Sequence, residues 1–161
     1  MRKAYFAGGC FWCITPIFRD KEGVLDVVSG YCGGKEKDPT YEQVKKQLTS
    51  HRETIMAEYD ERVSYKELLD IFISNVDPYD DGGQFIDRGH SYTLAIYYTD
   101  EEEKELAERC IEELERQSGK KAYIAIEPFE VFYEAEEYHQ NYDLKNAEAF
   151  KEELIKSGRV K

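Results

Sequence analysis

Two hydrophobic periods alternate along the chain. Runs that are rich in β-branched and aromatic residues, or apolar at every second position, predict strands over residues 2–7, 24–31, 54–59, 92–99 and 123–126. Apolar residues spaced three and four apart predict helices over residues 10–19, 41–48, 64–76, 100–118 and 143–157. Because strands and helices alternate, the pattern predicts layers of helices packed on a sheet.

The ends of several helices have recognisable signals. Ser64 and Glu67 have the spacing of a capping box, and Asp100 is placed to cap the helix that Gly119 ends. Gly158 is expected to end the last helix. Pro16 lacks a backbone donor, so the first helix is either irregular up to residue 15 or begins at Pro16 itself.

The chain has 161 residues and no repeat or linker, so we expect one domain over residues 1–161. Its strands are short, and neighbours in chain order are not expected to be all parallel. This favours an α+β arrangement over a doubly wound parallel sheet. Residues 77–89, rich in Asp, Gly and Pro, are expected to form a loop.

Charge and apolar run length narrow the possible partners and the compartment. The net charge of −12 argues against nucleic acid or an anionic membrane as a partner, since both need a basic surface. No run approaches the ~18 apolar residues that span a bilayer. The apolar stretch at residues 4–7 is too short for a signal-peptide core, so we expect a cytoplasmic protein with reduced thiols.

The most informative stretch is Gly8-Gly9-Cys10-Phe11-Trp12-Cys13. Cys10 follows a predicted strand and a glycine pair at the entrance of a predicted helix. Unpaired N–H groups and the helix dipole favour an anion there, so we expect Cys10 to be a nucleophile with a lowered pKa.

Cys13 follows Cys10 by three residues. In a regular helix such a pair has Cβ atoms about 5–6 Å apart, whereas a disulfide needs about 3.5–4.5 Å. A bond between them would need a local distortion, for which Pro16 is a candidate, and would be easily reduced. The main alternative for such a pair is half of a zinc site. Cys32, His51, His90 and His139 lack zinc-finger spacing, so we expect no bound metal and no cofactor.

Seven segments resemble, in family order, the type A peptide methionine sulfoxide reductases (MsrA). The segments are Gly9-Cys10-Phe11-Trp12, residues 30–34, residues 38–42, His51-Arg52-Glu53, Asp77-Pro78, residues 83–92 and residues 132–140. They cover most of the chain. The resemblance implies a ferredoxin-like α/β sandwich and the reduction of methionine S-sulfoxide, free or in proteins, with thioredoxin as the reductant.

The resemblance also implies roles for individual residues. Cys10 matches the nucleophile, and Glu53 matches the acid that protonates the sulfoxide oxygen. Phe11 and Trp12 match the aromatic wall that receives the substrate's methyl group. The residues that match the polar groups orienting the substrate are Tyr41, Asp87 and Tyr92. An acid that works near neutral pH needs a raised pKa, so we expect Glu53 to be buried among aromatic residues.

The identity of the resolving thiol stays open. Many members of the family carry recycling cysteines in a C-terminal tail, but here no cysteine follows Cys110. The resolving thiol must therefore be internal or supplied by another molecule. Cys13 is the first candidate because it is close to Cys10, and Cys32 is the second. Cys110 lies on a helical apolar stripe, so we expect it to be a buried core thiol.

Two other functions fit the same cysteine pair. A general thiol–disulfide oxidoreductase would reduce disulfides without any sulfoxide. A zinc-holding or protein-interaction module would bind metal stoichiometrically and would not depend on Glu53.

Overall fold

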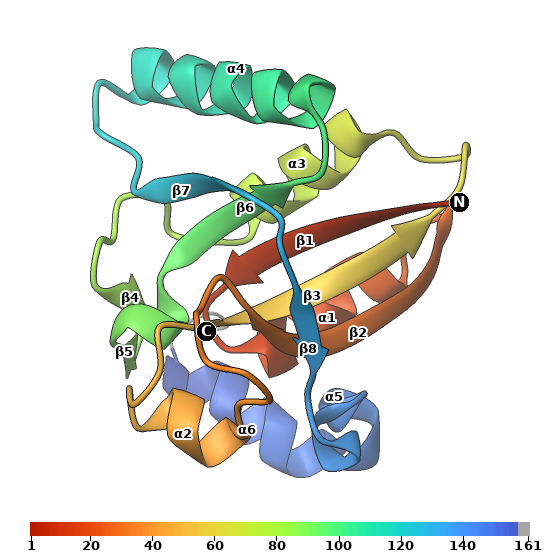
Figure 1. The fold of residues 1–161 in the computed structure, drawn as a ribbon, viewed down its shortest axis with the longest axis vertical. Helices are drawn as coiled ribbons and strands as arrows, with labels where there is room; N and C mark the ends of the chain where they lie inside the picture. Colours follow the sequence, from red (N-terminus) through yellow and green to blue (C-terminus); the bar gives the residue numbers. More distant parts are fainter. Residues whose placement is uncertain (158–161) are drawn as a thin grey trace.

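The computed structural model describes residues 1–157, with side chains to Lys156. Its centre is a six-stranded sheet in the order β7-β6-β1-β3-β2-β8 (Figure 1). The strands are β1 (Arg2–Gly8), β2 (Val24–Cys32), β3 (Arg52–Tyr59), β6 (Leu94–Tyr98), β7 (Ile124–Pro128) and β8 (Phe132–Glu134). Neighbouring strands are antiparallel, except for the parallel pair β6 and β7.

Helices and short elements connect these strands. The helices are α1 (Phe11–Arg19), α2 (Tyr41–Lys45), α3 (Tyr65–Ser74), α4 (Glu101–Ser118), α5 (Tyr142–Lys145) and α6 (Ala147–Ser157). A small hairpin of β4 (Gly83–Gln84) and β5 (Asp87–Arg88) and two 3-10 turns, η1 (His90–Tyr92) and η2 (Glu137–His139), complete the described elements.

The central part of this arrangement is ferredoxin-like. The chain runs β1-α1-β2-β3-α3-β6, and these strands lie in the order β6-β1-β3-β2. This confirms the fold class predicted from the sequence. Two further strands, β7 and β8, extend the sheet at opposite edges.

One face of the sheet packs against α1, α3 and α4. Its largest buried side chains include Phe6 from β1, Phe18 from α1 and Phe72 from α3. The ring of Phe6 stacks on both helix phenylalanines, with centroid distances of 5.4 Å to Phe18 and 5.1 Å to Phe72. Both helices are therefore fixed to the strand that leads directly into Cys10.

The other face is covered by the connection from β7 to β8, which Figure 1 shows crossing the sheet from one edge to the other. Phe129 on this connection stacks on Tyr5 at 4.0 Å, and Phe132 lies 5.6 Å from the same ring. Because both faces are covered, seven of the eight residues of β3 are buried. The alternation of apolar and polar residues in this strand therefore does not mean that one of its faces is exposed to solvent.

The segment after β8 is held against β2. Gln140 accepts a hydrogen bond from the Ser29 amide at 2.8 Å and donates to the Ser29 carbonyl at 2.9 Å. The Ala135 amide also donates to that carbonyl, at 2.9 Å. These bonds attach residues 135–140 to the strand that faces Glu53 across the ladder.

Several predicted boundaries were wrong for identifiable reasons. Helix α1 begins at Phe11 and continues through Pro16, so the prediction of a helix that begins at Pro16 was wrong. Within this helix, the Thr15 hydroxyl donates to the Phe11 carbonyl at 2.8 Å. The single last helix is split at Asn146 into α5 and α6. Strand β8 and the β4–β5 hairpin were missed. The expected stop at Gly158 lies outside the described residues.

The connection that crosses the sheet generates a stability prediction. Phe129→Ala removes the ring that covers Tyr5 and is expected to lower the free energy of unfolding by about 2 kcal/mol in urea denaturation. Val131→Ala is the matched control, because this side chain is 38% exposed on the same connection. The control should cost less than about 0.5 kcal/mol. Equal losses in the two variants would contradict the covering role of Phe129.

Candidate functional site

The site begins where β1 passes into α1. Gly9 has a φ of 91°, a conformation that favours glycine, and it turns the chain into the helix. Cys10 is the N-cap residue, with extended backbone angles, and its half-buried side chain does not cap the helix. The Cys13 amide donates to the Cys10 carbonyl at 3.1 Å. Cys10 thus lies just outside the helix, and the spacing of a regular helical pair does not apply to it.

The thiols of Cys10 and Cys13 interact directly. A hydrogen bond with Cys13 raises the pKa of Cys10 well above that of an ordinary thiol, and burial and the carboxylates of Glu53 and Asp87 act in the same direction. The lowered pKa expected from the helix entrance was therefore wrong. A neighbouring thiol, burial and nearby acids outweigh the helix dipole at this position.

Glu53 lies on β3, opposite Tyr31 on β2, and only 1% of it is exposed. Its Oε1 accepts the Phe11 amide at 3.2 Å, whereas Oε2 is buried with no hydrogen-bond partner among the described residues. Burial raises the pKa of Glu53 to about 8; the Phe11 amide and the Tyr92 phenol oppose this rise, and Asp87 adds to it. Glu53 is therefore protonated at neutral pH, as the sequence predicted for an acid at this position.

Three further predicted residues surround these groups. Tyr92 interacts electrostatically with Glu53, Tyr41, Cys10 and Asp87, which places all five side chains in one cluster. Burial is the main cause that raises the pKa of Tyr41 and of Tyr92, so both phenols remain hydrogen-bond donors. Tyr92 reaches the cluster from η1 rather than from the predicted strand, and Asp87 reaches it from the β4–β5 hairpin.

Phe11 and Trp12 form an aromatic wall beside this cluster. The ring of Tyr41 lies 6.1 Å from Phe11 and 6.0 Å from Trp12, close to parallel with both. Tyr142 from α5 stacks on the indole of Trp12 at 3.9 Å. Phe11 is buried and Trp12 is half-buried, so Trp12 is the member of the wall that is open to a ligand.

Glu136 and His139 bind residues of the wall, and no role was predicted for Glu136 from the sequence. His139 accepts the Trp12 indole N–H on Nδ1 at 3.0 Å. Glu136 accepts the Tyr31 hydroxyl at 2.9 Å and the Tyr41 amide at 3.1 Å. Burial alone would raise the pKa of Glu136, but these bonds lower it below its usual range. The only signal for Glu136 and His139 in the sequence was their place in the segment 132–140, which resembles the family.

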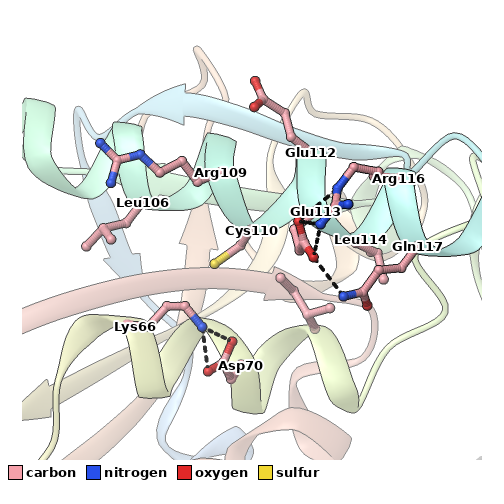
Figure 2. Close-up of a pocket in the computed structure, with 11 residues that line it drawn as sticks. Lys66, Asp70, Leu106, Arg109, Cys110, Glu112, Glu113, Leu114, Arg116 and Gln117 are labelled. Atoms are coloured by element: carbon pink, nitrogen blue, oxygen red, sulfur yellow. Dashed lines mark hydrogen bonds and ion pairs between the residues drawn. The ribbon is translucent and has the colours of Figure 1, made fainter.

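The other two cysteines lie away from Cys10. Cys32 is on the opposite face of the sheet, where its thiol donates to the Val131 carbonyl at 3.2 Å. Burial raises the pKa of Cys32 to about 12. Cys110 lines a groove of about 670 Å³ between α3 and α4, above the Lys66–Asp70 ion pair (Figure 2). Cys110 is half-buried rather than a fully buried core thiol.

Within residues 1–157, no three His, Cys, Asp or Glu side chains are grouped so as to hold a metal ion. No helix in that range has the length and apolar character needed to cross a membrane.

Known proteins match this arrangement over nearly the whole chain. The family model for peptide methionine sulfoxide reductase matches residues 2–161. A relative from Nautilia profundicola, the peptide methionine sulfoxide reductase MsrA, is 50% identical over 91% of this chain and 84% of its own length. The crystal structure of reduced Mxr1 from Saccharomyces cerevisiae has a TM-score of 0.85 and 30% identity, and covers 91% of this chain and 86% of that one.

A further structure, Mxr1 in complex with Trx2, has a TM-score of 0.58 and 18% identity over 88% of this chain and 84% of that one, and it supports the fold alone. The family assignment follows from the family model and from the bacterial relative. The chain belongs to the peptide methionine sulfoxide reductase family.

Proposed function

We propose that this chain reduces methionine S-sulfoxide, free or in proteins, to methionine, with Cys10 as nucleophile and Glu53 as acid. The observation that carries the proposal is a protonated carboxyl held beside a reactive thiol. Glu53 is buried with its pKa raised to about 8, and it interacts electrostatically with Cys10. A sulfoxide sulfur is a poor electrophile until its oxygen is protonated, so this pair supplies both reacting groups.

The first step leaves Cys10 as a sulfenic acid. Glu53 gives its proton to the sulfoxide oxygen while the Cys10 sulfur attacks the sulfoxide sulfur. The proton released by the Cys10 thiol returns to the Glu53 carboxylate. The hydroxyl then transfers from the substrate sulfur to the Cys10 sulfur as the bond between the two sulfurs breaks, so Cys10 becomes a sulfenic acid and methionine leaves. Cys10 is oxidised by two electrons, and the substrate gains them.

The surrounding residues orient the sulfoxide. Phe11 and Trp12 offer an apolar wall that fits the substrate's methyl group, and the exposed part of Trp12 makes this wall accessible. The buried phenols of Tyr41 and Tyr92 can donate to the sulfoxide oxygen, and Asp87 can accept a donor of the substrate. Such preorganised donors act strongly where water is excluded.

In the second step, the Cys13 thiol attacks the Cys10 sulfenic acid, and water leaves as the disulfide forms. The hydrogen bond between the two thiols in the reduced state supports Cys13 for this role. Cys32, the second candidate, lies on the opposite face of the sheet and is hydrogen-bonded to the Val131 carbonyl. A disulfide between Cys10 and Cys32 would require the end of β2 to rearrange.

An external dithiol must then restore both thiols, and we propose thioredoxin for this role. The yeast relative, which shares this fold, was solved in complex with Trx2. Because this cycle needs a reducing pool, we also propose that the protein acts in the cytoplasm.

The function is tested by incubating the reduced protein with each epimer of a methionine sulfoxide peptide, without any reductant. We expect one methionine from the S epimer for every two thiols lost, and none from the R epimer. The absence of methionine from the S epimer would refute the proposal. Reduction of a disulfide substrate without sulfoxide would favour the general oxidoreductase instead.

Glu53→Gln tests the acid. The variant keeps the shape of the side chain but has no proton to give, so single-turnover methionine release is expected to slow by about 10²–10⁴-fold. In the unchanged protein this rate should fall as the pH rises through about 8, where Glu53 loses its proton. Glu58→Gln, on the same strand, is the control and should leave the rate unchanged. A normal rate in Glu53→Gln would show that the proton comes from elsewhere.

Glu53→Gln should also be more stable than the unchanged protein at pH 7. The pKa of Glu53 is about 8 in the folded state and close to its ordinary value when unfolded, so stability is lost as the pH rises between those two values. The neutral amide avoids this loss. Thermal unfolding should therefore show a higher midpoint at pH 7, with the difference vanishing near pH 4.5, the ordinary pKa of a glutamate carboxyl.

Cys13→Ser tests the resolving thiol. It is expected to abolish thioredoxin-driven turnover while sparing one stoichiometric methionine per chain, because Cys10 still reacts once. Cys110→Ser is the control and should turn over normally, since that thiol lies in the groove between α3 and α4. Should Cys13→Ser turn over repeatedly and Cys32→Ser fail, Cys32 would be the resolving thiol.

A further inference from the structure

We infer that a cavity behind Cys13, separate from the substrate site, is the entry for the external reductant's thiol, and that α6 is its cover. The inference rests on the proposed role of Cys13 as the resolving thiol. It assigns a second point of access to the redox pair and a function to the last described helix.

The cavity has a volume of about 410 Å³. It is lined by side chains of α1, of the segment around the end of α3, of the hairpin and of α6: Cys13, Pro16, Ile17, Ser74, Asn75, Val76, Asp77, Phe85, Phe150 and Leu154. Neither Cys10 nor Glu53 contributes to this lining, and the residues of the aromatic wall do not contribute either. The two cysteines of the pair therefore differ in access, with Cys10 on the substrate side and Cys13 on this cavity.

This geometry decides which sulfur an incoming thiolate meets. A thiolate of the reductant attacks the Cys13 sulfur, the Cys10–Cys13 bond breaks, and Cys10 leaves as a thiolate that takes up a proton. The second thiol of the reductant then attacks the mixed disulfide and releases Cys13, which also takes up a proton. Two electrons and two protons pass from the dithiol to the enzyme, and the reductant becomes a disulfide.

Helix α6 is placed to cover the cavity and is only lightly packed. Phe150 and Leu154 are the two side chains of α6 that line it. From Ala147 to Lys156 no side chain is buried; Phe150 and Leu154 are half-buried, and the others are exposed. An element that buries so little apolar surface opens locally at low free-energy cost.

Helix α5, in contrast, is anchored. Arg19 donates to both carboxylate oxygens of Asp143 at 2.7 Å, and Tyr142 stacks on Trp12 at 3.9 Å. Asn146 separates the two helices with non-helical backbone angles. Motion about Asn146 would move α6 away from Cys13 while α5 stays against the substrate wall.

The size of the cavity predicts a difference between reductants. A volume of about 410 Å³ admits a small molecule but no folded protein. Dithiothreitol can therefore reach Cys13 with α6 in place, whereas thioredoxin needs α6 to move.

The test uses the full chain in its oxidised, disulfide form, mixed with reduced thioredoxin or with dithiothreitol, and counts thiols over time. In the double variant Phe150→Ala and Leu154→Ala, we expect the thioredoxin rate to rise about tenfold and the dithiothreitol rate to change by less than about twofold. The matched control is Ile155→Ala, on the exposed side of the same helix at 55% exposure, and should change neither rate. Stoichiometric methionine release should stay the same in all variants.

Two outcomes would overturn the inference. An unchanged thioredoxin rate would show that α6 does not limit access, and a slower one would show that α6 is part of the surface that binds the reductant. Neither outcome touches the proposed function, which fails separately if methionine release does not consume the thiols of Cys10 and Cys13.

Discussion

Glu53 remains uncharged because the fold removes water from both faces of its strand, and the rest of the site depends on this. Helices cover one face, and the connection carrying Phe129 covers the other. A carboxyl in such surroundings keeps its proton, and the Phe11 amide donates a hydrogen bond to its Oε1. The same amide belongs to the first residue of α1. This one hydrogen bond between β3 and the start of α1 therefore fixes the position of Glu53 relative to Cys10.

The four consecutive residues from Cys10 to Cys13 lie in four different surroundings. A helix turns about 100° per residue, so neighbours in sequence face different directions. Cys10 precedes the helix beside Glu53, and Phe11 enters the core. Trp12 leans toward Tyr142, and Cys13 faces the cavity under α6. A compact sequence motif can therefore carry both halves of a redox cycle without the two reactants sharing one approach.

Most of the fold could be predicted from the sequence because its helices and main strands have strong periodicity and clear caps. Thr40 and Ser64 begin helices with complete capping boxes. The short elements could not be predicted: β8 and the β4–β5 hairpin are too brief to show a period, and β8 forms through pairing with the distant strand β2. The raised pKa of Cys10 was missed for a related reason. Helix position is visible in the sequence, whereas the carboxyls of Glu53 and Asp87 arrive from other strands.

The bonds of Glu136 to Tyr31 and Tyr41 have a consequence for the order in which the protein becomes active. Synthesis proceeds from the N-terminus, so the nascent chain carries Cys10 and Glu53 well before the residues that brace the aromatic wall. Tyr41 and Trp12 gain their partners Glu136 and His139 only when residues 136–139 have been translated. A truncated translation product would hold both reactive groups but lack the bracing that shapes the pocket. Catalytic competence thus depends on a segment that is translated long after both reactive groups.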